Sequence, residues 1–274
     1  MTATTVRESA GLLRVLPIPL RSRGSLHLVE RHALVYRHAW LILVSGLLEP
    51  LFYLLSIGVG LGQLVGHVTG PGGSPVSYTA FVAPALLASS SMNGALYDST
   101  FNVFFRLKYA KLYDAALATP MRAGDVALGE ITWALIRGGL YASAFMVIML
   151  AMGLVYSAWA VLAVPVALLI GFAFAAAGMA GTTYMRSWQH FEFVTLATLP
   201  MFLFSTTFYP LGVYPRPAQI IVECTPLYQG VTLIRGLTLG VVGPGLLWHT
   251  AYLALTGVTG LYVAGRRIGG LLLR

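Results

Sequence analysis

The chain has 274 residues, of which 57% are apolar and only 9% are charged. A soluble domain carries about a quarter charged residues, so this composition excludes a soluble globular protein and indicates one embedded in a membrane. The formal net charge of +8 does not indicate nucleic-acid binding, because Lys and Arg gather in the segments beside the apolar runs. The single cysteine, Cys224, excludes an intrachain disulfide and a zinc cluster of thiolates.

The N-terminal part precedes the first long apolar run. Residues 1–24 are polar and include Pro17 and Pro19, which predicts a mobile cytoplasmic tail. From Ser25 to His38, apolar side chains recur on one helical face, which favours a helix lying in the membrane interface. The alternative is an extension of the first span into water. We therefore expect two units, a tail over residues 1–24 and a transmembrane domain over residues 25–274.

Six apolar runs follow, each about the twenty residues that a hydrocarbon core of roughly 30 Å demands. They predict six transmembrane helices, at Trp40–Leu64, Tyr78–Phe104, Val126–Leu154, Trp159–Met185, Phe193–Leu211 and Gly245–Ala264. The fold class is thus an all-α membrane protein. The link between the first two runs, Gly66–Ser77, is rich in Gly, Pro and Ser and has no Lys, Arg, Asp or Glu, as in an outside loop.

The basic residues predict the orientation of the spans. Fourteen of them fall before the first span, between the second and third, after the fourth, or after the last. Only Arg216 and Arg235 fall on the other side, and Arg137 lies inside a span. Since basic loops stay in the cytoplasm, we expect both termini to be cytoplasmic.

A short basic segment, Arg106–Asp125, separates the second and third runs. Its middle, Tyr109–Thr119, has apolar residues spaced three and four apart and ends at Pro120, which predicts a short cytoplasmic helix that could dock on a partner. The alternative is a solvated turn whose charges anchor two helix ends. The candidate docking residues are Arg106, Lys108, Tyr109, Lys111, Leu112, Tyr113 and Asp114.

The segment between the fifth and sixth runs does not fit a plain loop. It contains several prolines but also the apolar stretches Gln219–Cys224 and Gly230–Gly240, each too short to cross a membrane. Two re-entrant helices over Pro215–Val242 would satisfy the backbone if protein covers them. An amphipathic surface loop is the alternative.

Charged residues inside the runs are the remaining candidates for function, because a charge in the hydrocarbon core needs a partner. They are Glu49, Asp98, Glu130 and Arg137. At 1.5 Å per residue, Glu49 lies about 13 Å and Arg137 about 18 Å from the cytoplasmic end of their spans. We expect these two to pair, with Glu130 as the alternative partner. A snorkelling Arg137 with a protonated Glu49 would also explain the sequence.

Three motifs in order resemble the ABC-2 type exporter permeases, in the branch of nodulation lipo-oligosaccharide and daunorubicin-resistance permeases. They are EPLFYLLSIGVGLG (Glu49–Gly62), TPMRAGDVALGEITWA (Thr119–Ala134), and FSTTFYPLG with PLYQGVTLIRG (Phe204–Gly212, Pro226–Gly236). The chain has no phosphate-binding loop of the form GxxxxGK[ST], no HExxH and no GxSxG. Any nucleotide chemistry must therefore belong to a partner.

The resemblance implies a domain of six helices that pairs with a second permease copy, as a homodimer or a paralogous heterodimer, and with two copies of a separate ATPase. It assigns Tyr109–Thr119 as the coupling helix on that ATPase, and it matches both the interfacial helix and the re-entrant pair. ATP and magnesium would bind the partner, with no cofactor in this chain. The candidate gate residues on the outer side are Phe208, Tyr209, Pro210, Pro226 and Arg235. Gln229 departs from the family pattern, where a histidine is frequent.

These observations predict the permease subunit of an ATP-driven exporter in the plasma membrane, the inner membrane of a two-membrane cell. It would move an amphipathic, lipid-linked or drug-like molecule outward, and the chain itself would not be an enzyme. An ion-coupled secondary transporter is the alternative. Such a transporter would place ionisable residues at the midplane and usually show an internal repeat, and we find no convincing repeat of three spans.

Overall fold

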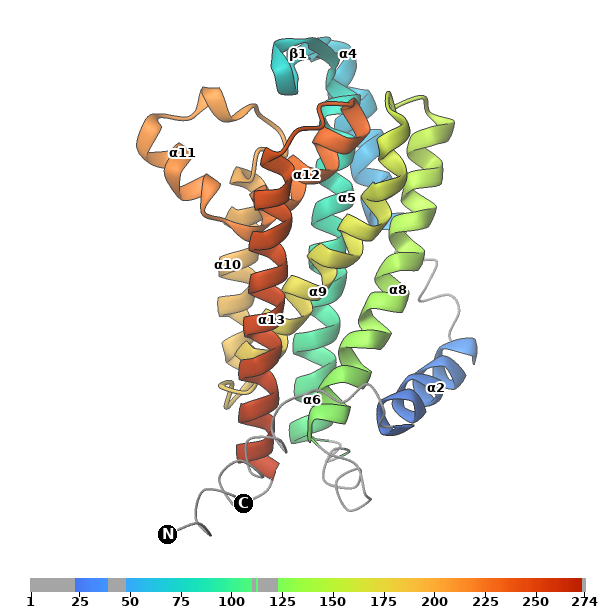
Figure 1. The fold of residues 1–274 in the computed structure, drawn as a ribbon, viewed down its shortest axis with the longest axis vertical. Helices are drawn as coiled ribbons and strands as arrows, with labels where there is room; N and C mark the ends of the chain where they lie inside the picture. The colour runs from blue at the N-terminus through green and yellow to red at the C-terminus, as the bar shows by residue number, and fades with distance from the viewer. Residues whose placement is uncertain (1–22, 39–47, 110–111, 113–122, 273–274) are drawn as a thin grey trace.

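The computed structural model describes residues 23–38, 48–109, 112 and 123–272. Long helices run side by side along the length of the molecule, and a shorter helix, α2 (Arg23–His38), lies at an angle beside their lower end (Figure 1). Short helices and a small hairpin gather at the upper end. The fold is therefore a helical bundle with different additions at its two ends.

The first half of the bundle alternates regular and π-helical segments. A helix over Leu48–Val65 includes the π-helix η1 (Leu54–Leu61) and α4 (Gly62–Val65). The second helix is continuous through α5 (Tyr78–Tyr97), the π-helix η3 (Asp98–Asn102) and α6 (Val103–Lys108). The third is α8 (Ala123–Ala151). The helix predicted before these spans is present as α2, whose Leu28 packs against Gly129 of α8.

The second half contains two long helices and several short ones. The 3-10 turn η4 (Ala158–Leu162) leads into α9 (Ala163–Thr182), and η5 (Trp188–His190) leads into α10 (Phe191–Phe204). After the 3-10 turn η6 (Leu211–Val213) come α11 (Arg216–Glu223), α12 (Pro226–Leu239) and the final helix α13 (Gly245–Leu272). Helices α13 and α9 approach so closely that a Cβ on Gly260 would lie 2.8 Å from the backbone of Ala176 and Ala177.

The Gly66–Ser77 link is not a plain loop. Strands β1 (His67–Thr69) and β2 (Pro75–Ser77) pair antiparallel, with His67 opposite Ser77 and Val68 opposite Val76. The 3-10 turn η2 (Pro71–Gly73) joins them, and Gly72 and Gly73 have positive φ angles. Ser77 then caps α5 by accepting a hydrogen bond from the amide of Ala80 at 3.3 Å. The hairpin is an addition to the all-α prediction.

Three described helices are long and apolar enough to cross a membrane: Leu48–Val65, Gly124–Ala151 and Ala158–Thr182. The predicted start of the first span at Trp40 lies outside the described residues. Two predicted boundaries were wrong. The fifth helix, α10, stops at Phe204 instead of Leu211, and α13 continues past Ala264 to Leu272. The first error arises because Ser205 and Thr206 leave the helical conformation inside an apolar run.

Candidate functional site

The basic segment begins at the lower end of α6. Arg106 and Lys108 lie in its last turn, and Tyr109 follows with an exposed side chain. Leu112 is half-buried and packs against the hydrophobic core. The other docking candidates, Lys111, Tyr113 and Asp114, lie outside the described residues, as does most of the predicted helix Tyr109–Thr119.

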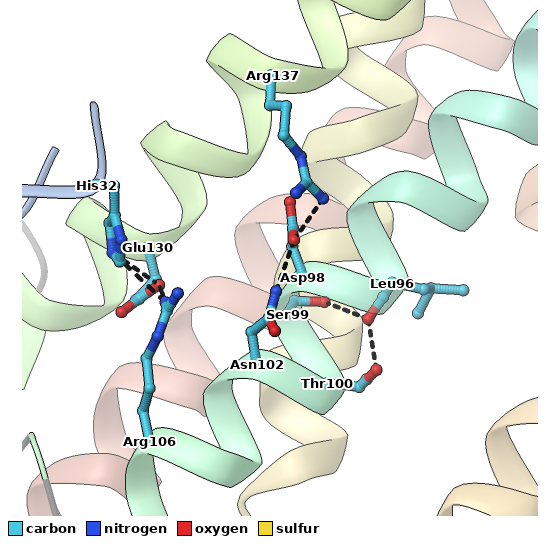
Figure 2. A network of polar contacts seen from close by, with 9 residues as sticks. All are labelled: His32, Leu96, Asp98, Ser99, Thr100, Asn102, Arg106, Glu130 and Arg137. Atoms are coloured by element: carbon cyan, nitrogen blue, oxygen red, sulfur yellow. Dashed lines mark hydrogen bonds and ion pairs between the residues drawn. The ribbon is translucent and has the colours of Figure 1, made fainter. Parts of the chain in front are cut away.

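One carboxylate joins three helices above this segment. Arg106 of α6 forms a salt bridge with Glu130 of α8, and His32 of α2 lies 3.4 Å from the same oxygen, Oε2 (Figure 2). The side chain of Glu130 is only 4% exposed. His32 also stacks on Trp133, with ring centroids 5.7 Å apart. These four residues, which we call the Glu130 cluster, tie α2 and α8 to the helix that leads into the basic segment.

A second ion pair lies farther along α8. Arg137 Nη2 is 2.5 Å from Oδ1 of Asp98, the first residue of the π-helix η3, and Asn102 donates a hydrogen bond of 2.8 Å to the same oxygen (Figure 2). Ser99 and Thr100 donate their hydroxyl hydrogens to the carbonyl of Leu96. The π-helix is thus held by its own polar side chains while it presents a buried carboxylate to α8.

The predicted pair of Glu49 with Arg137 was wrong. Arg137 pairs with Asp98, the alternative partner Glu130 pairs with Arg106, and the side chain of Glu49 is exposed. The distance of each residue from the cytoplasmic end of its span predicts similar depths for Arg137 and Glu49. It does not predict which neighbouring helix each of the two side chains meets. Helix η1, which follows Glu49, packs on α5, whereas η3 is in contact with α8.

At the opposite end of the bundle, Arg235 of α12 is 5% exposed and packs over the ring of Phe81 at 3.7 Å. Its Nε donates to the carbonyl of Phe81 at 3.1 Å. Its two terminal nitrogens donate to Thr206, one to the carbonyl at 2.8 Å and one to the hydroxyl at 3.3 Å. The two halves of the third sequence motif therefore meet at this guanidinium.

Thr206 adopts a conformation that is unusual for a β-branched residue, with a φ of 56°. It lies in the turn that follows α10, and Ser205, Thr206 and Thr207 are all buried. Backbone strain of this kind costs about 1–3 kcal/mol and persists only where the surroundings hold it. Here the bonds from Arg235 to Thr206 provide that support.

The remaining gate candidates differ in their surroundings. Pro210 lines a cavity of about 390 Å³ together with Arg235. Phe208 packs edge-on against Phe202 with centroids 5.4 Å apart, whereas Tyr209 is 57% exposed. Pro226 is at the start of α12, where Thr225 accepts a hydrogen bond from the amide of Tyr228. The structure thus brings Pro210 and Arg235 to one site and leaves Tyr209 at the surface.

Comparison with known proteins establishes the family. The model of the ABC-2 type transporter family matches residues 25–239 of the chain. The chain belongs to the ABC-2 type transporter family. It is 36% identical over 224 residues to nodulation protein J of Rhizobium leguminosarum bv. trifolii, which covers 79% of this chain and 83% of that protein. The proteins of the same name from Rhizobium meliloti and Sinorhizobium fredii are 32% and 30% identical and cover 83% and 86% of the chain.

This membership makes the chain the permease subunit of an ABC-2 exporter, a multi-pass membrane protein that works with an ATPase subunit. The resemblance in the sequence is confirmed, and the secondary-transporter alternative is set aside. The matched region ends at residue 239, the last residue of α12, so it includes both ion-pair clusters and Arg235.

Gln229, where the resemblance leads us to expect a histidine, has the imidazole of His249 beside it. Gln229 of α12 is buried, donates from Nε2 to the carbonyl of Glu223, and contacts Nδ1 of His249 through Oε1. His249 belongs to the first turns of α13. No pattern in the sequence predicts this contact, because the two residues lie on different helices.

Proposed function

We propose that the permease has six transmembrane helices with both termini in the cytoplasm, and that α11 and α12 form a re-entrant pair on the outer side. Three spans have the required length and hydropathy in the structure. The other three correspond to the continuous α5–η3–α6 helix, to α10 and to α13. The basic residues favour this orientation, since six of the 17 Lys and Arg residues precede the first span, four lie within residues 106–122 and three lie within residues 266–274.

The permease would work as a pair, either a homodimer or a heterodimer with a paralogous chain, on two copies of the separate ATPase. ATP and Mg²⁺ bind in the ATPase. Its closure would press on Tyr109–Thr119, and the Glu130 cluster would pass that displacement to α2 and α8. This cluster is the observation that carries the proposal, because it connects the docking segment to two further helices through one buried carboxylate.

The transported molecule is proposed to be amphipathic, lipid-linked or drug-like, and to leave the cell through the plasma (inner) membrane. The relatives are named for nodulation, which supports a secreted product over a nutrient taken up. The exposed apolar side chains of the spans, such as Leu140 and Val147 on α8, would face lipid or the second permease copy. Efflux of a toxic compound fits the same geometry.

The test is ATP-driven export by the permease reconstituted with its ATPase. Leu112→Glu and Tyr113→Asp should leave the protein in the membrane but separate ATP hydrolysis from export, because each puts a charge on the apolar face of the docking helix. Tyr156→Asp is the matched control, since Tyr156 is exposed in the link between α8 and η4. Export should also survive a proton uncoupler. Unchanged export in both docking variants would refute the proposal.

A further inference from the structure

The cavity beside Arg235 is built from several separate parts of the chain. Its volume is about 390 Å³, within the roughly 300–1,000 Å³ typical of ligand sites. Thr69 of the hairpin, Thr206 of the strained turn, Thr232 of α12 and Leu246 of α13 all line it. A cavity assembled from such distant segments is held in shape by the fold itself.

The electrostatics of the cavity favour an anion. Arg235 and His249 line it, and none of the lining residues is acidic. Within the described part of the chain, no carboxylate forms a salt bridge with Arg235. A buried guanidinium usually lies beside an opposite charge, because the loss of its hydration is costly. Around Arg235, the described residues supply carbonyl and hydroxyl dipoles but no carboxylate within salt-bridge distance.

The guanidinium also keeps hydrogen-bonding capacity. It has five N–H groups, and three of them donate to Phe81 and Thr206. The two others, one on each terminal nitrogen, belong to a side chain that lines the cavity. Each of these two N–H groups can donate one charge-assisted hydrogen bond to a phosphate oxygen, which is stronger than a bond between neutral groups.

The rest of the lining suits an amphiphile. Phe81, Leu211, Val241 and Leu246 are apolar, while Thr69, Thr232 and Tyr228 offer hydroxyl groups. An ion without a hydrophobic part would leave this apolar surface unused. The lining therefore combines a positive group with apolar walls, the two properties of a site for a lipid head group.

We propose that this cavity binds the phosphate head group of an anionic amphiphile, with Arg235 as the group that contacts the phosphate. The inference rests on the proposed function only in assigning the cavity to the outer side. The ligand would be a membrane phospholipid or an exported lipid with an anionic head, which share this chemistry. A tight site there would hold the head group after it has crossed the membrane.

The test is calorimetric titration of the full-length permease, purified with its ATPase in a neutral detergent and without ATP. Three probes separate the contribution of the phosphate from that of the acyl chains: short-chain phosphatidylglycerol, sn-glycerol 3-phosphate and dihexanoylglycerol. We expect saturable binding of the phospholipid, weaker binding of glycerol phosphate, and no binding of the uncharged diacylglycerol. Equal binding of the first two would overturn the assignment to an amphiphile, because it would show that the acyl chains are not recognised.

Two pairs of variants make the result specific. Arg235→Gln should weaken phosphatidylglycerol binding by about tenfold or more, because a hydrogen bond to a charged group is lost. Arg216→Gln is its control, an exposed arginine on α11 that bonds Gln219. Val241→Trp should block the cavity without touching the bonds of Arg235, and Val242→Trp is its control, since Val242 is similarly exposed but does not line the cavity.

Two further outcomes would overturn the proposal. One is equal binding of dihexanoylglycerol and phosphatidylglycerol, which would show that charge is not recognised. The other is unchanged binding in both Arg235→Gln and Val241→Trp. The titration contains no ATP, so neither outcome tests export. Export is tested separately, with the docking variants Leu112→Glu and Tyr113→Asp.

Discussion

Two arginines of this permease are buried in different ways. Arg137 on α8 meets a carboxylate, Asp98, which itself accepts a further hydrogen bond from Asn102. Arg235 on α12 meets the Phe81 ring and the oxygens of Phe81 and Thr206, with no carboxylate among the described residues within salt-bridge distance. Both side chains are mostly shielded, 11% exposed for Arg137 and 5% for the whole residue Arg235.

The difference separates a charge that the fold neutralises from one that it leaves available. The Asp98–Arg137 pair joins two neighbouring helices, and its contribution lies in holding α8 against η3. Arg235 holds the strained turn at Thr206 through neutral acceptors and keeps its net charge facing a cavity. We therefore expect variants at the first site to act through folding and variants at the second to act through ligand binding.

The largest effect is expected at Asp98. Asp98→Leu leaves the guanidinium of Arg137 buried without its carboxylate, and breaking a buried pair in this way costs about 3–5 kcal/mol. Arg137→Met should cost less, because the remaining carboxyl group can bind a proton whereas a guanidinium cannot lose one. The measurement is the thermal unfolding midpoint of each variant in detergent. A lower midpoint for Arg137→Met than for Asp98→Leu would contradict this order.

A packing defect that involves no charge should have an intermediate effect on stability. Gly260→Ala places a methyl group 2.8 Å from the backbone of α9, so α13 must shift and stability should fall by about 1–3 kcal/mol. Gly269→Ala on the same helix is the control, since no atom lies within 4 Å of its added Cβ. Equal unfolding midpoints for the two variants would show that the α9–α13 contact is not tight.

Arg106 is a third arginine for the comparison, and its side chain is more exposed than that of Arg137. Glu130→Gln removes the charge that pairs with Arg106, but Arg106 is 19% exposed and can turn toward water. We therefore expect a loss of only about 1 kcal/mol. The loss should be local and should appear as faster hydrogen exchange of the α2 amides, because His32 also contacts Glu130. Exchange that rises equally in α2 and α9 would indicate a global effect instead.

Apolar runs predicted most of the helices, because the length of such a run is a local property of the sequence. The second helix begins at Tyr78 and the last at Gly245, as the sequence predicts. The hairpin in the outer link was not predicted, since its strands have only three residues each. The early end of α10 depends on the contact of Thr206 with Arg235, which is distant in sequence.

The pairing of charges could not be predicted from depth alone. The π-helix at Asp98 adds a residue to the turn, which rotates the following helix face by roughly 100° and alters which neighbour each side chain meets. The Glu130 cluster involves three helices, one of them outside the spans. Arg235 was predicted only as a gate candidate on the outer side, and its burial within the largely buried α12 is a finding of the structure.

The two expected re-entrant helices are covered to different extents. In α12, Leu233 is 2% exposed, whereas Ile220 and Ile221 in α11 are 54% and 69% exposed in the single chain. That α11 is shielded from water in the membrane remains a prediction. Cysteine substitutions at Ile220, Ile221 and Leu233 should resist aqueous thiol reagents, while residues of Gly66–Ser77 should react.

The central claim is that Asp98 and Arg137 act as one neutral unit, and a double-mutant cycle tests it most directly. The free energies of unfolding of Asp98→Leu, Arg137→Met and the double variant are compared with the unmodified permease in the same detergent. Because the double variant buries no lone charge, it should be more stable than Asp98→Leu by about 2 kcal/mol or more. The coupling free energy then equals that difference plus the loss caused by Arg137→Met alone. A double variant whose loss equals the sum of the single losses would contradict the account.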